Sequence, residues 1–596
     1  MQTYRAPVED FRFILHDVLK VDNYRNLPSF EELAPDLISA IFQEGAKFCE
    51  EQLLPLNASA DAEGCRYEDG EVKTPSGFKE AYETYIQGGW TGLASDPEYG
   101  GQGLPRVIAG CIGEMMMSAN LSFSTYPGLS TGAVEAIHNH GSEQQKTTYL
   151  PNLISGKWGG TMNLTEPHCG TDLGLMRTKA EPQSDDTYSI TGTKIFITSG
   201  EHDLTENIVH LVLAKVPGGP PGIRGVSLFI VPKFLVTDGD ALGERNGVRC
   251  GSIEHKMGIN GSATCVMNYE DATGYLLGGE HKGMRAMFTM MNAARLAVGI
   301  QGLALSETAY QSAAAYAKER RQGRALSGAK EPDEAADPII VHPDIRRMLM
   351  SMRAFNEGAR ALAMWVGLHL DFSTVHPDER TRQDSEDLVA LLTPVIKAYF
   401  TDYGFEAVNM GLQCFGGAGY IQETGMEQLV RDARISQVYE GANGIQALDL
   451  VGRKLPAHMG RSLRQFFHPV DQFIQKHAGD EDMRPYVAPL AKSFGRLQQA
   501  TLWIGEQGLS DPDQAAAAAS DYLRLMGLVA LGFMWARIVE TARQKLDEDV
   551  DNREFYEAKL VTGRFFMERM LPDTSSLLSK LTSGAANVMA LDAAAF

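Results

Sequence analysis

Hydrophobic residues recur at helical spacing along most of the chain and at strand spacing only in its second quarter. In the first 158 residues, apolar positions three and four apart predict amphipathic helices, for example over 11–19 and 37–54. A Gly- and Pro-rich stretch at 96–105 interrupts the pattern and predicts a loop. The N-terminal part of the chain is therefore expected to be helical.

Between residues 159 and 280 the pattern changes to short runs of Val, Ile, Thr and Phe, separated by Gly, Pro and Asp. Runs of this kind predict strands, here at 160–164, 188–191, 194–198, 208–214, 225–231 and 264–269. Several short strands at such spacing indicate a small β-barrel or sandwich. The chain is expected to place this β-domain between two helical parts.

Long helical patterns return after the β-domain. Those at 284–321, 345–370 and 388–414 indicate an antiparallel four-helix bundle. A second helical block follows residue 456, and no chemistry is recognisable in it. The fold class is therefore α+β and mainly α. The expected domains are an N-terminal helical extension, a helical domain, a β-domain, a four-helix bundle and a C-terminal helical domain, over 1–34, 35–158, 159–280, 281–455 and 456–596.

Composition and charge exclude several classes of protein. With 44% hydrophobic and 22% charged residues, the chain is unlike a disordered protein or a coiled coil. A net charge of −22 argues against a nucleic-acid partner. The seven cysteines show no metal-ligand or CxxC spacing, so no metal is expected and a reducing compartment fits. Neither a targeting peptide nor a membrane span is recognisable, and the cytoplasm is the predicted location.

Glu440 is the candidate proton acceptor of the chain. It stands between Tyr439 and Gly441, at the end of an apolar run and before a helix-like segment at 445–455. Burial of a lone carboxylate raises its pKa, which makes it a usable base near neutral pH. The alternative is that Glu440 only complements the dipole of the following helix.

Four other polar motifs are candidate ligand sites. The turn 165–172 is rich in hydroxyls, and Gly170 allows a ligand to approach closely. On the strand 194–198, Phe196 and Thr198 share one face, where an aromatic ring and a hydroxyl suit a flat heteroaromatic ligand. The Gly-rich turn 413–420 and the arginine-rich helix end 319–324 suit a pyrophosphate. Each also has a purely structural interpretation: a surface loop capped by Asp172, a half-buried strand, a helix C-cap and a dipole-complementing helix end.

Taken in order, these motifs resemble the acyl-CoA dehydrogenase family over residues 35–455. They are the 141–158 segment, Thr165-Glu-Pro, 194–200, Glu319-Arg-Arg-Gln, 413–420 and Tyr439-Glu-Gly-Ala-Asn-Gly-Ile-Gln446. The resemblance implies a helical N-terminal domain, a middle β-barrel domain and a four-helix bundle, with FAD held between the β-domain and the bundle. It also implies α,β-dehydrogenation of an acyl-CoA thioester to the trans-2-enoyl-CoA, in which Glu440 takes the α-proton and flavin N5 the β-hydride.

The same resemblance implies the roles of individual residues. FAD would be bound by Met162, Leu164, Thr165, Phe196, Thr198, Arg320, Gln322, Gln413, Gly416, Gly417 and Asn443. The substrate would be bound by Thr171, Arg295, Tyr439 and Gly441. Some members carry the base just before the arginine that Arg295 matches, but that position is Ala294 here, so Glu440 remains. The chain departs from the family pattern at Ala442, usually Thr, and at Phe196, usually Trp.

The N-terminal extension and the block after residue 456 resemble a bacterial subgroup of long acyl-CoA dehydrogenases. That subgroup includes enzymes for 3-methylmercaptopropionyl-CoA in dimethylsulfoniopropionate breakdown and others for fatty acyl-CoA in β-oxidation. The implied substrate is 3-methylmercaptopropionyl-CoA or a short- or medium-chain acyl-CoA, and the implied partners are an electron-transfer flavoprotein and a second copy of the chain. A long-chain acyl-CoA dehydrogenase, an acyl-CoA oxidase and a catalytically silent flavoprotein or assembly factor are the alternatives.

Overall fold

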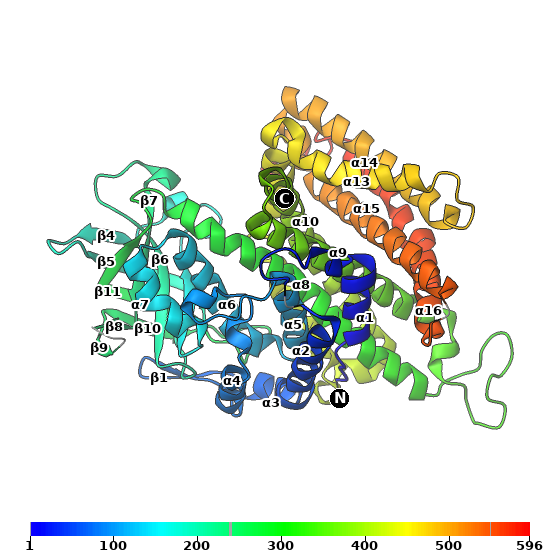
Figure 1. Cartoon of the computed structure of the whole chain (residues 1–596), viewed down its shortest axis with the longest axis horizontal. Coiled ribbons are helices and arrows are strands. Elements are labelled where there is room, and N and C mark those ends of the chain that lie inside the picture. Colours follow the sequence, from blue (N-terminus) through cyan, green and yellow to red (C-terminus); the bar gives the residue numbers. More distant parts are fainter. Residues whose placement is uncertain (1, 32, 238–240, 549) are drawn as a thin grey trace. The chain divides into compact units, whose positions relative to one another are not determined.

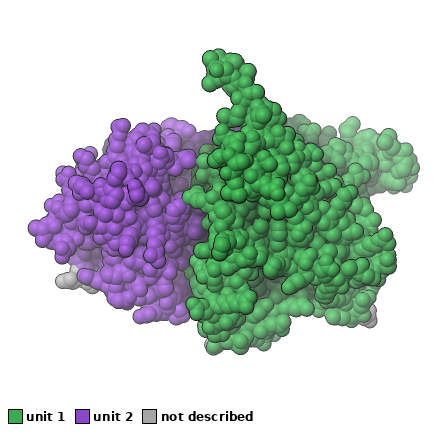
Figure 2. Space-filling view, turned by 90° about the horizontal axis from the view of Figure 1, so that it is seen from above, with its two compact units in different colours: residues 1–46, 106–118, 298–596 green, residues 47–105, 119–297 purple. Residues whose placement is uncertain are grey.

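The computed structural model describes residues 2–31, 33–237, 241–548 and 550–596. They fall into two units, coloured separately in Figure 2. The β unit comprises residues 47–105 and 119–297, and the helical unit comprises residues 1–46, 106–118 and 298–596.

The β unit consists of a β-sheet and the helices that pack on it (Figure 1). Its helices are α3 (Leu54–Glu63), α4 (Phe78–Gln87), α6 (Leu121–His140) and α7 (Glu143–Ile154). Its main strands are β3 (Trp158–Asn163), β4 (Lys179–Pro182), β5 (Tyr188–Thr198), β6 (Asn207–Lys215), β7 (Val226–Pro232), β10 (Val248–Ile253) and β11 (Thr264–Leu277). Two short hairpins are formed by β1 (Arg66–Glu68) with β2 (Glu71–Lys73) and by β8 (Phe234–Val236) with β9 (Leu242–Arg245).

The main sheet closes into a barrel. Strands follow the order β10-β11-β5-β4-β6-β3. Strand β7 pairs with both β11 and β6, so β11, β5, β4, β6 and β7 form a closed ring of paired strands. In the closed barrel, nearly all residues of strand β6 are buried. Leu211 and Leu213 pack with helices α6 and α7, while Val212 and Ala214 pack with the other strands. This explains the unbroken apolar run of β6, since a strand covered on both faces has no polar side.

Three helices have residues in both units: α2 (Pro35–Phe48), α5 (Arg106–Ala119) and α8 (Gly283–Glu319). The other helices of the helical unit are α1 (Val8–Arg12), α9 (Pro343–Val375), α10 (Glu379–Phe415), α11 (Met426–Arg434), α12 (Asn443–Asp449), α13 (Arg461–Lys476), α14 (Arg484–Ser510), α15 (Pro512–Asp547), α16 (Arg553–Phe565) and α17 (Thr574–Leu581). Helices α8 and α10 approach closely at Gly302 and Gly404. This approach requires glycine, because a Cβ at either position would collide with the backbone of the facing helix. The predicted fold class is confirmed: the chain is mainly helical, with a β-barrel in its middle part and further helices after residue 456.

The C-terminal helices pack around α15, drawn in orange in Figure 1. Trp535 of α15 is fully buried, and its indole N–H donates to the carbonyl of Ala354 on α9 at 2.8 Å. Gly358 makes room for that indole, since a Cβ there would lie 2.7 Å from Trp535 Nε1. Helix α15 is long and apolar enough to cross a membrane, but 89% of its most apolar window is buried within the structure, as in the central helix of a packed domain.

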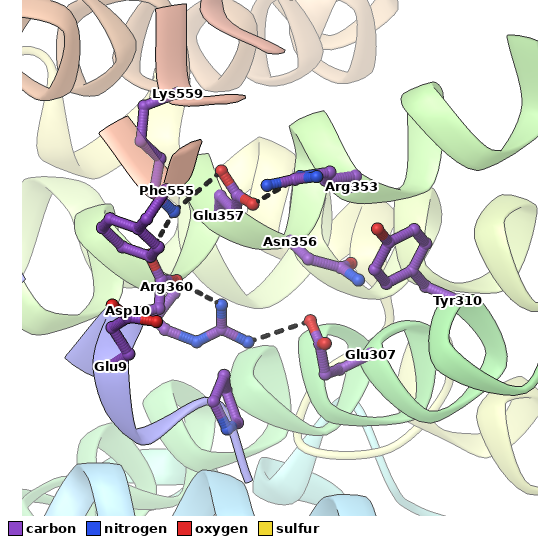
Figure 3. A pocket seen from close by; sticks show the side chains of 11 residues that line it. Glu9, Asp10, Glu307, Tyr310, Arg353, Asn356, Glu357, Arg360, Phe555 and Lys559 are labelled. Atoms are coloured by element: carbon purple, nitrogen blue, oxygen red, sulfur yellow. Dashed lines mark hydrogen bonds and ion pairs between the residues drawn. The ribbon is translucent and has the colours of Figure 1, made fainter. Parts of the chain in front are cut away.

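A cluster of buried charges joins the N-terminal extension, the bundle and the C-terminal domain (Figure 3). The Arg360 guanidinium on α9 contacts carboxylates of Asp10, Glu114 and Glu307 at 2.6, 2.7 and 3.0 Å. Lys559 on α16 pairs with Asp10 and, at 2.9 Å, with Glu357. We call these residues the Arg360 cluster. All its members except Glu114 line a cavity of about 190 Å³, and the cluster holds together segments that are far apart in the sequence.

The structure differs from the predicted elements in several places, and β4, β8, β9 and β10 are among the strands that were not predicted. The predicted strands at 188–191 and 194–198 form one strand, β5, because Gly192 continues the extended backbone between them. The β1–β2 hairpin, which lies within the N-terminal region expected to be helical, was not predicted. Its strands are only three residues long and are mostly exposed, so they leave no hydrophobic alternation to read.

Candidate active site

Glu440 lies in a short loop of the helical unit, between a 3-10 turn (Ile435–Gln437) and α12. Its backbone has φ 57°, and that of Gly441 has φ 86°, so two consecutive residues are left-handed. For a non-glycine residue this conformation costs about 1–3 kcal/mol and persists only where surrounding contacts enforce it. The side chain of Glu440 is partly exposed. The loop therefore holds a carboxylate at the surface of the unit in a conformation that needs support.

That support comes from three helices. From α12, the amide of Gln446 donates to the carbonyl of Glu440 at 3.1 Å. From α10, the ammonium of Lys397 donates to the carbonyl of Gly441 at 2.8 Å and to Asn443 Oδ1 at 2.7 Å. From α8, Gln301 accepts a hydrogen bond from the hydroxyl of Tyr439. The backbone on both sides of Glu440 is thus fixed by side chains that the rest of the bundle positions.

A second group of candidate residues follows the end of β3 in the β unit. Met162, Leu164 and Thr165 are half-buried there. The fully buried Lys194 of β5 donates to the carbonyl of Leu164 and to the carboxylate of Glu166, each at 2.9 Å. Burial raises the pKa of Glu166, but Lys194 and the donors of Arg177 and Thr178 outweigh it and lower that pKa to about 2. The turn after β3 is therefore held against β5 by an ionised buried pair.

A β-bulge in β5 presents Phe196 and Thr198. Cys265 pairs with Ile197 and Met267 with Lys194, so one residue of β11 faces two of β5. Phe196 lies at this bulge with φ 59°, and its ring is 59% exposed. Lys194 and Ile197, three residues apart, are both buried, whereas Thr198 is half-buried. The bulge thus coincides with an outward-facing aromatic ring two residues before a half-buried threonine.

The residues of these groups fit FAD in their chemistry. An exposed aromatic ring held in a strained backbone, two threonine hydroxyls and the apolar Met162 and Leu164 suit a flat heteroaromatic ring with polar edges. The mixed apolar and hydrogen-bonding character is what a flavin requires.

The ends of α8 and α10 form the third group. Arg320 and Gln322 follow α8, and Gln413, Gly416 and Gly417 end α10; all five are exposed. The rings of Tyr316 and Phe415 stack with centroids 4.1 Å apart, which brings the two helix ends together. Gly416 caps α10 with φ 59°, and a Cβ at Gly416 or Gly417 would meet no atom within 4 Å. This open surface of arginine and glycine backbone suits a phosphate.

Thr171 and Arg295 are the remaining sequence candidates. Thr171 is exposed in the turn before a 3-10 helix, where Asp172 accepts from the Gly174 N–H at 3.0 Å as a cap. Arg295 on α8 is buried, with its guanidinium 5.7 Å from the centre of the Phe288 ring. Ala294 precedes it and offers no group for proton transfer.

Sequence reasoning missed Lys194 and Lys397, the two buried lysines that hold the candidate loops. A signal was available, because each lysine adjoins an apolar run. Lys397 interrupts Pro394-Val-Ile-Lys-Ala-Tyr-Phe, and Lys194 begins Lys-Ile-Phe-Ile. A lysine is almost never fully buried without a partner. Such a lysine therefore marks a buried acceptor, although the sequence does not say which one.

We expect Lys194→Met to weaken FAD retention about tenfold, equivalent to about 1.4 kcal/mol. The substitution frees the Leu164 carbonyl and the turn that carries Thr165. It also leaves Glu166 buried without its cation, so the double variant Lys194→Met/Glu166→Gln separates loss of stability from loss of the turn. FAD content after dialysis, measured by absorbance, is the readout. Lys179→Met, on exposed β4, is the control and should retain FAD like the unmodified chain.

Comparison with known proteins adds to this geometry. Family models described as acyl-CoA dehydrogenase N-terminal, middle and C-terminal domains match residues 38–157, 161–272 and 281–455. One described as acetyl-CoA dehydrogenase C-terminal like matches residues 466–592.

Two relatives and one solved structure are similar over nearly the whole chain. The chain is 42% identical to 3-methylmercaptopropionyl-CoA dehydrogenase of Ruegeria pomeroyi, over 97% of this chain and 98% of that protein. It is 33% identical to the broad-specificity linear acyl-CoA dehydrogenase FadE5 of Mycobacterium tuberculosis, over the full length of both. An acyl-CoA dehydrogenase of Bacillus anthracis, crystallised with FAD, shares the fold with a TM-score of 0.74 at 21% identity, covering 97% of this chain and 92% of that one.

Proposed function

The chain belongs to the acyl-CoA dehydrogenase family, and from that premise we propose which residues carry its reaction and which acyl-CoA it takes. It is an FAD-dependent oxidoreductase that acts on acyl-CoA. The observation that carries the proposal is the loop of Glu440, whose left-handed backbone is fixed by Lys397, Gln446 and the Tyr439–Gln301 bond. The role of proton acceptor explains why a carboxylate is held in so constrained a conformation, and no other role in the proposal explains it.

In the proposed mechanism the Glu440 carboxylate removes the α-proton of the thioester and becomes a carboxylic acid. The electron pair of the broken C–H bond passes toward the thioester carbonyl, where the Glu440 backbone N–H would donate a hydrogen bond to the developing negative charge. FAD, when bound, supplies the acceptor for the hydride that leaves the β-carbon. The double bond then forms between the α- and β-carbons, which gives the trans-2-enoyl-CoA.

The other candidate residues hold the two ligands. Met162, Leu164, Thr165, Phe196 and Thr198 would hold the flavin ring. Asn443 and the exposed groups at the ends of α8 and α10 would hold the rest of FAD, and Thr171, Arg295, Tyr439 and Gly441 would bind the acyl-CoA. Ala442 leaves this loop without the hydroxyl that the family usually has there.

The proposed substrate is 3-methylmercaptopropionyl-CoA or a short- or medium-chain acyl-CoA. Support comes from the 42% identity to a 3-methylmercaptopropionyl-CoA dehydrogenase over nearly the full length of both chains. The second candidate is a longer linear acyl-CoA, which the 33% identity to a broad-specificity linear acyl-CoA dehydrogenase favours.

Anaerobic titration distinguishes these substrates. We expect the visible flavin band of the purified protein to be lost on addition of 3-methylmercaptopropionyl-CoA, with butyryl-CoA slower and palmitoyl-CoA slowest, because FAD itself receives the electrons. The reverse order would assign the enzyme to long chains. A bound flavin that no thioester bleaches would indicate a silent flavoprotein, and hydrogen peroxide formed in air at the rate of substrate loss would indicate an oxidase.

The proposed partners are an electron-transfer flavoprotein and a second copy of the chain, in the cytoplasm. An exposed apolar surface beside the phosphate-binding candidates supports the dimer, since Tyr420 is 81% and Ile421 50% exposed next to Gly416 and Gly417. Sedimentation equilibrium is expected to give twice the chain mass, and a monomer at micromolar concentration would contradict the dimer.

A further inference from the structure

Lys397 is a buried cation directed at the loop of the proposed base. It lies in the middle of α10 and is fully buried. Its ammonium donates to the carbonyl of Gly441 at 2.8 Å and to Asn443 Oδ1 at 2.7 Å. A buried lysine is costly unless its donors are satisfied, so these acceptors are a strong constraint on where the loop can lie.

Asn443 connects this lysine to an acid on the same helix. Its amide nitrogen donates to Asp402 Oδ1 at 2.6 Å and to Thr401 Oγ1 at 2.9 Å. The same Asp402 oxygen accepts from Gln437 at 2.8 Å, on the other side of Glu440 in the sequence. Asp402 therefore holds residues on both sides of Glu440, and the Asn443 amide links it to Lys397, about one turn away on α10.

The bond to Gly441 acts where the backbone is strained. The carbonyl that Lys397 holds belongs to the second of the two left-handed residues, and it follows the peptide that joins Glu440 to Gly441. Because Glu440 directly precedes Gly441, a change in the backbone torsions of Gly441 would shift the Glu440 backbone relative to α10, and the carboxylate and N–H of Glu440 with it. Gln446, the other donor to this carbonyl, lies farther away at 3.4 Å. Of these two side-chain donors to the Gly441 carbonyl, Lys397 makes the shorter bond.

We propose that Lys397 is a positioning residue for the α-proton transfer, which it serves by holding the left-handed Glu440–Gly441 backbone through the Gly441 carbonyl and Asn443. The inference rests on the proposed function, because it assigns no role to Lys397 beyond the orientation of Glu440. Lys397 exchanges no proton with the substrate. A displacement of the base by about 1 Å lowers the rate of a positioned reaction by up to about 100-fold.

The test measures proton transfer without oxidation. A 3-thiaacyl-CoA has sulfur in place of the β-carbon, so it cannot be dehydrogenated, yet its α-protons still exchange with D2O when a base removes them. Mass spectrometry of the thioester gives the exchange rate per bound FAD. We expect Lys397→Met to slow this exchange about 10- to 100-fold and to lower kcat by a similar factor, with KM changed less than threefold.

Two further variants make the result specific. Lys397→Arg keeps a cation and donors and should restore part of the exchange. If Lys397 had a purely structural role, the exchange rates of the variants would instead vary with their FAD content and melting temperature. Lys454→Met, at a partly exposed lysine after α12, controls for loss of a lysine and should exchange at the unmodified rate. A folded, FAD-loaded Lys397→Met with unchanged exchange would overturn the proposal.

Two outcomes separate this inference from the proposed function. If the unmodified protein exchanges no α-protons, or if Glu440→Gln exchanges them normally, the assignment of Glu440 is wrong. If Glu440→Gln abolishes exchange and Lys397→Met does not, only the role of Lys397 is wrong. Should Lys397→Met fail to fold, Asn443→Leu, which removes one of its two acceptors, is measured in the same way. Unchanged exchange in that variant also overturns the proposal.

Discussion

Glu440→Gln is expected to fold and bind FAD but to reduce its flavin about 10²- to 10⁴-fold more slowly than the unmodified protein, the contribution typical of a general base. The amide keeps the size of the side chain and has no basic oxygen. The left-handed backbone of Glu440 is fixed by bonds to neighbouring main-chain groups and side chains, so the substitution should leave the loop in place. Stopped-flow absorbance after anaerobic mixing with acyl-CoA measures the rate.

Two variants control for this result. Glu423→Gln makes the same chemical change at an exposed acid on a neighbouring turn and should reduce at the unmodified rate. Glu440→Asp keeps the base but shortens it by one methylene, so an intermediate rate is expected. A Glu440→Gln variant that bleaches as fast as the unmodified protein would rule out Glu440, and Ala294 at the alternative position could not replace it.

How much of this structure the sequence predicts depends on how far apart in the chain the interacting residues lie. The long helices were predictable because their apolar spacing repeats over many turns, as in α10, which extends over Glu379–Phe415 against a predicted 388–414. The strand pattern predicted a barrel or a sandwich without deciding between them, and only the family resemblance named the barrel. Its closure depends on β7 pairing with both β6 and β11, and nothing in a local pattern specifies a pairing between distant segments.

The candidate site also combines features that local motifs predict with features that depend on distant segments. Glu440, Phe196 and Thr198 could be named from local motifs, but the left-handed backbone at Glu440 and Phe196 could not, since glutamate and phenylalanine rarely adopt it. The bulge at Phe196 arises from the register with β11. Lys194 and Lys397 escaped notice because each has one backbone carbonyl and one side chain as partners, and no local pattern shows which groups the fold brings to a lysine. The roles of the sequence-derived residues stay predictions until the variants above are measured.

The N-terminal extension and the C-terminal block were predicted as separate helical segments without a function. The structure gives both segments a common function within the helical unit. Asp10 of the extension lies between Arg360 of the bundle and Lys559 of the C-terminal domain. Each added segment supplies a charge that the others bury. The extension and the C-terminal block are therefore parts of one folded body.

Arg360→Met tests this view, and we expect it to lower the free energy of unfolding by about 3–5 kcal/mol, the range for removing one partner of a buried ion pair. The variant leaves Asp10, Glu114 and Glu307 buried without the guanidinium that now contacts all three. Urea unfolding followed by circular dichroism measures the change, and limited proteolysis should cut the N-terminal extension of the variant first. Arg347→Met, on the same helix but 52% exposed, is the matched control and should cost under about 1 kcal/mol.

The destabilisation by Arg360→Met should also grow with pH. Burial raises the pKa of Glu114 to about 7 even with Arg360 beside it, so its ionisation is already disfavoured in the folded state and stability falls as the pH rises from about 4.5 toward 7. Without Arg360 that pKa rises further, and so does the pKa of Asp10, which Lys559 and Arg360 now hold below its usual value against the effect of burial. At pH 5 the variant can protonate its stranded carboxyl groups at little cost, whereas at pH 8 it must bury them as anions or take up protons against the gradient. A gap between variant and unmodified protein that is wider at pH 8 than at pH 5 is therefore expected, and an equal gap at both values would show that lost packing of the arginine side chain, rather than its charge, holds the three segments together.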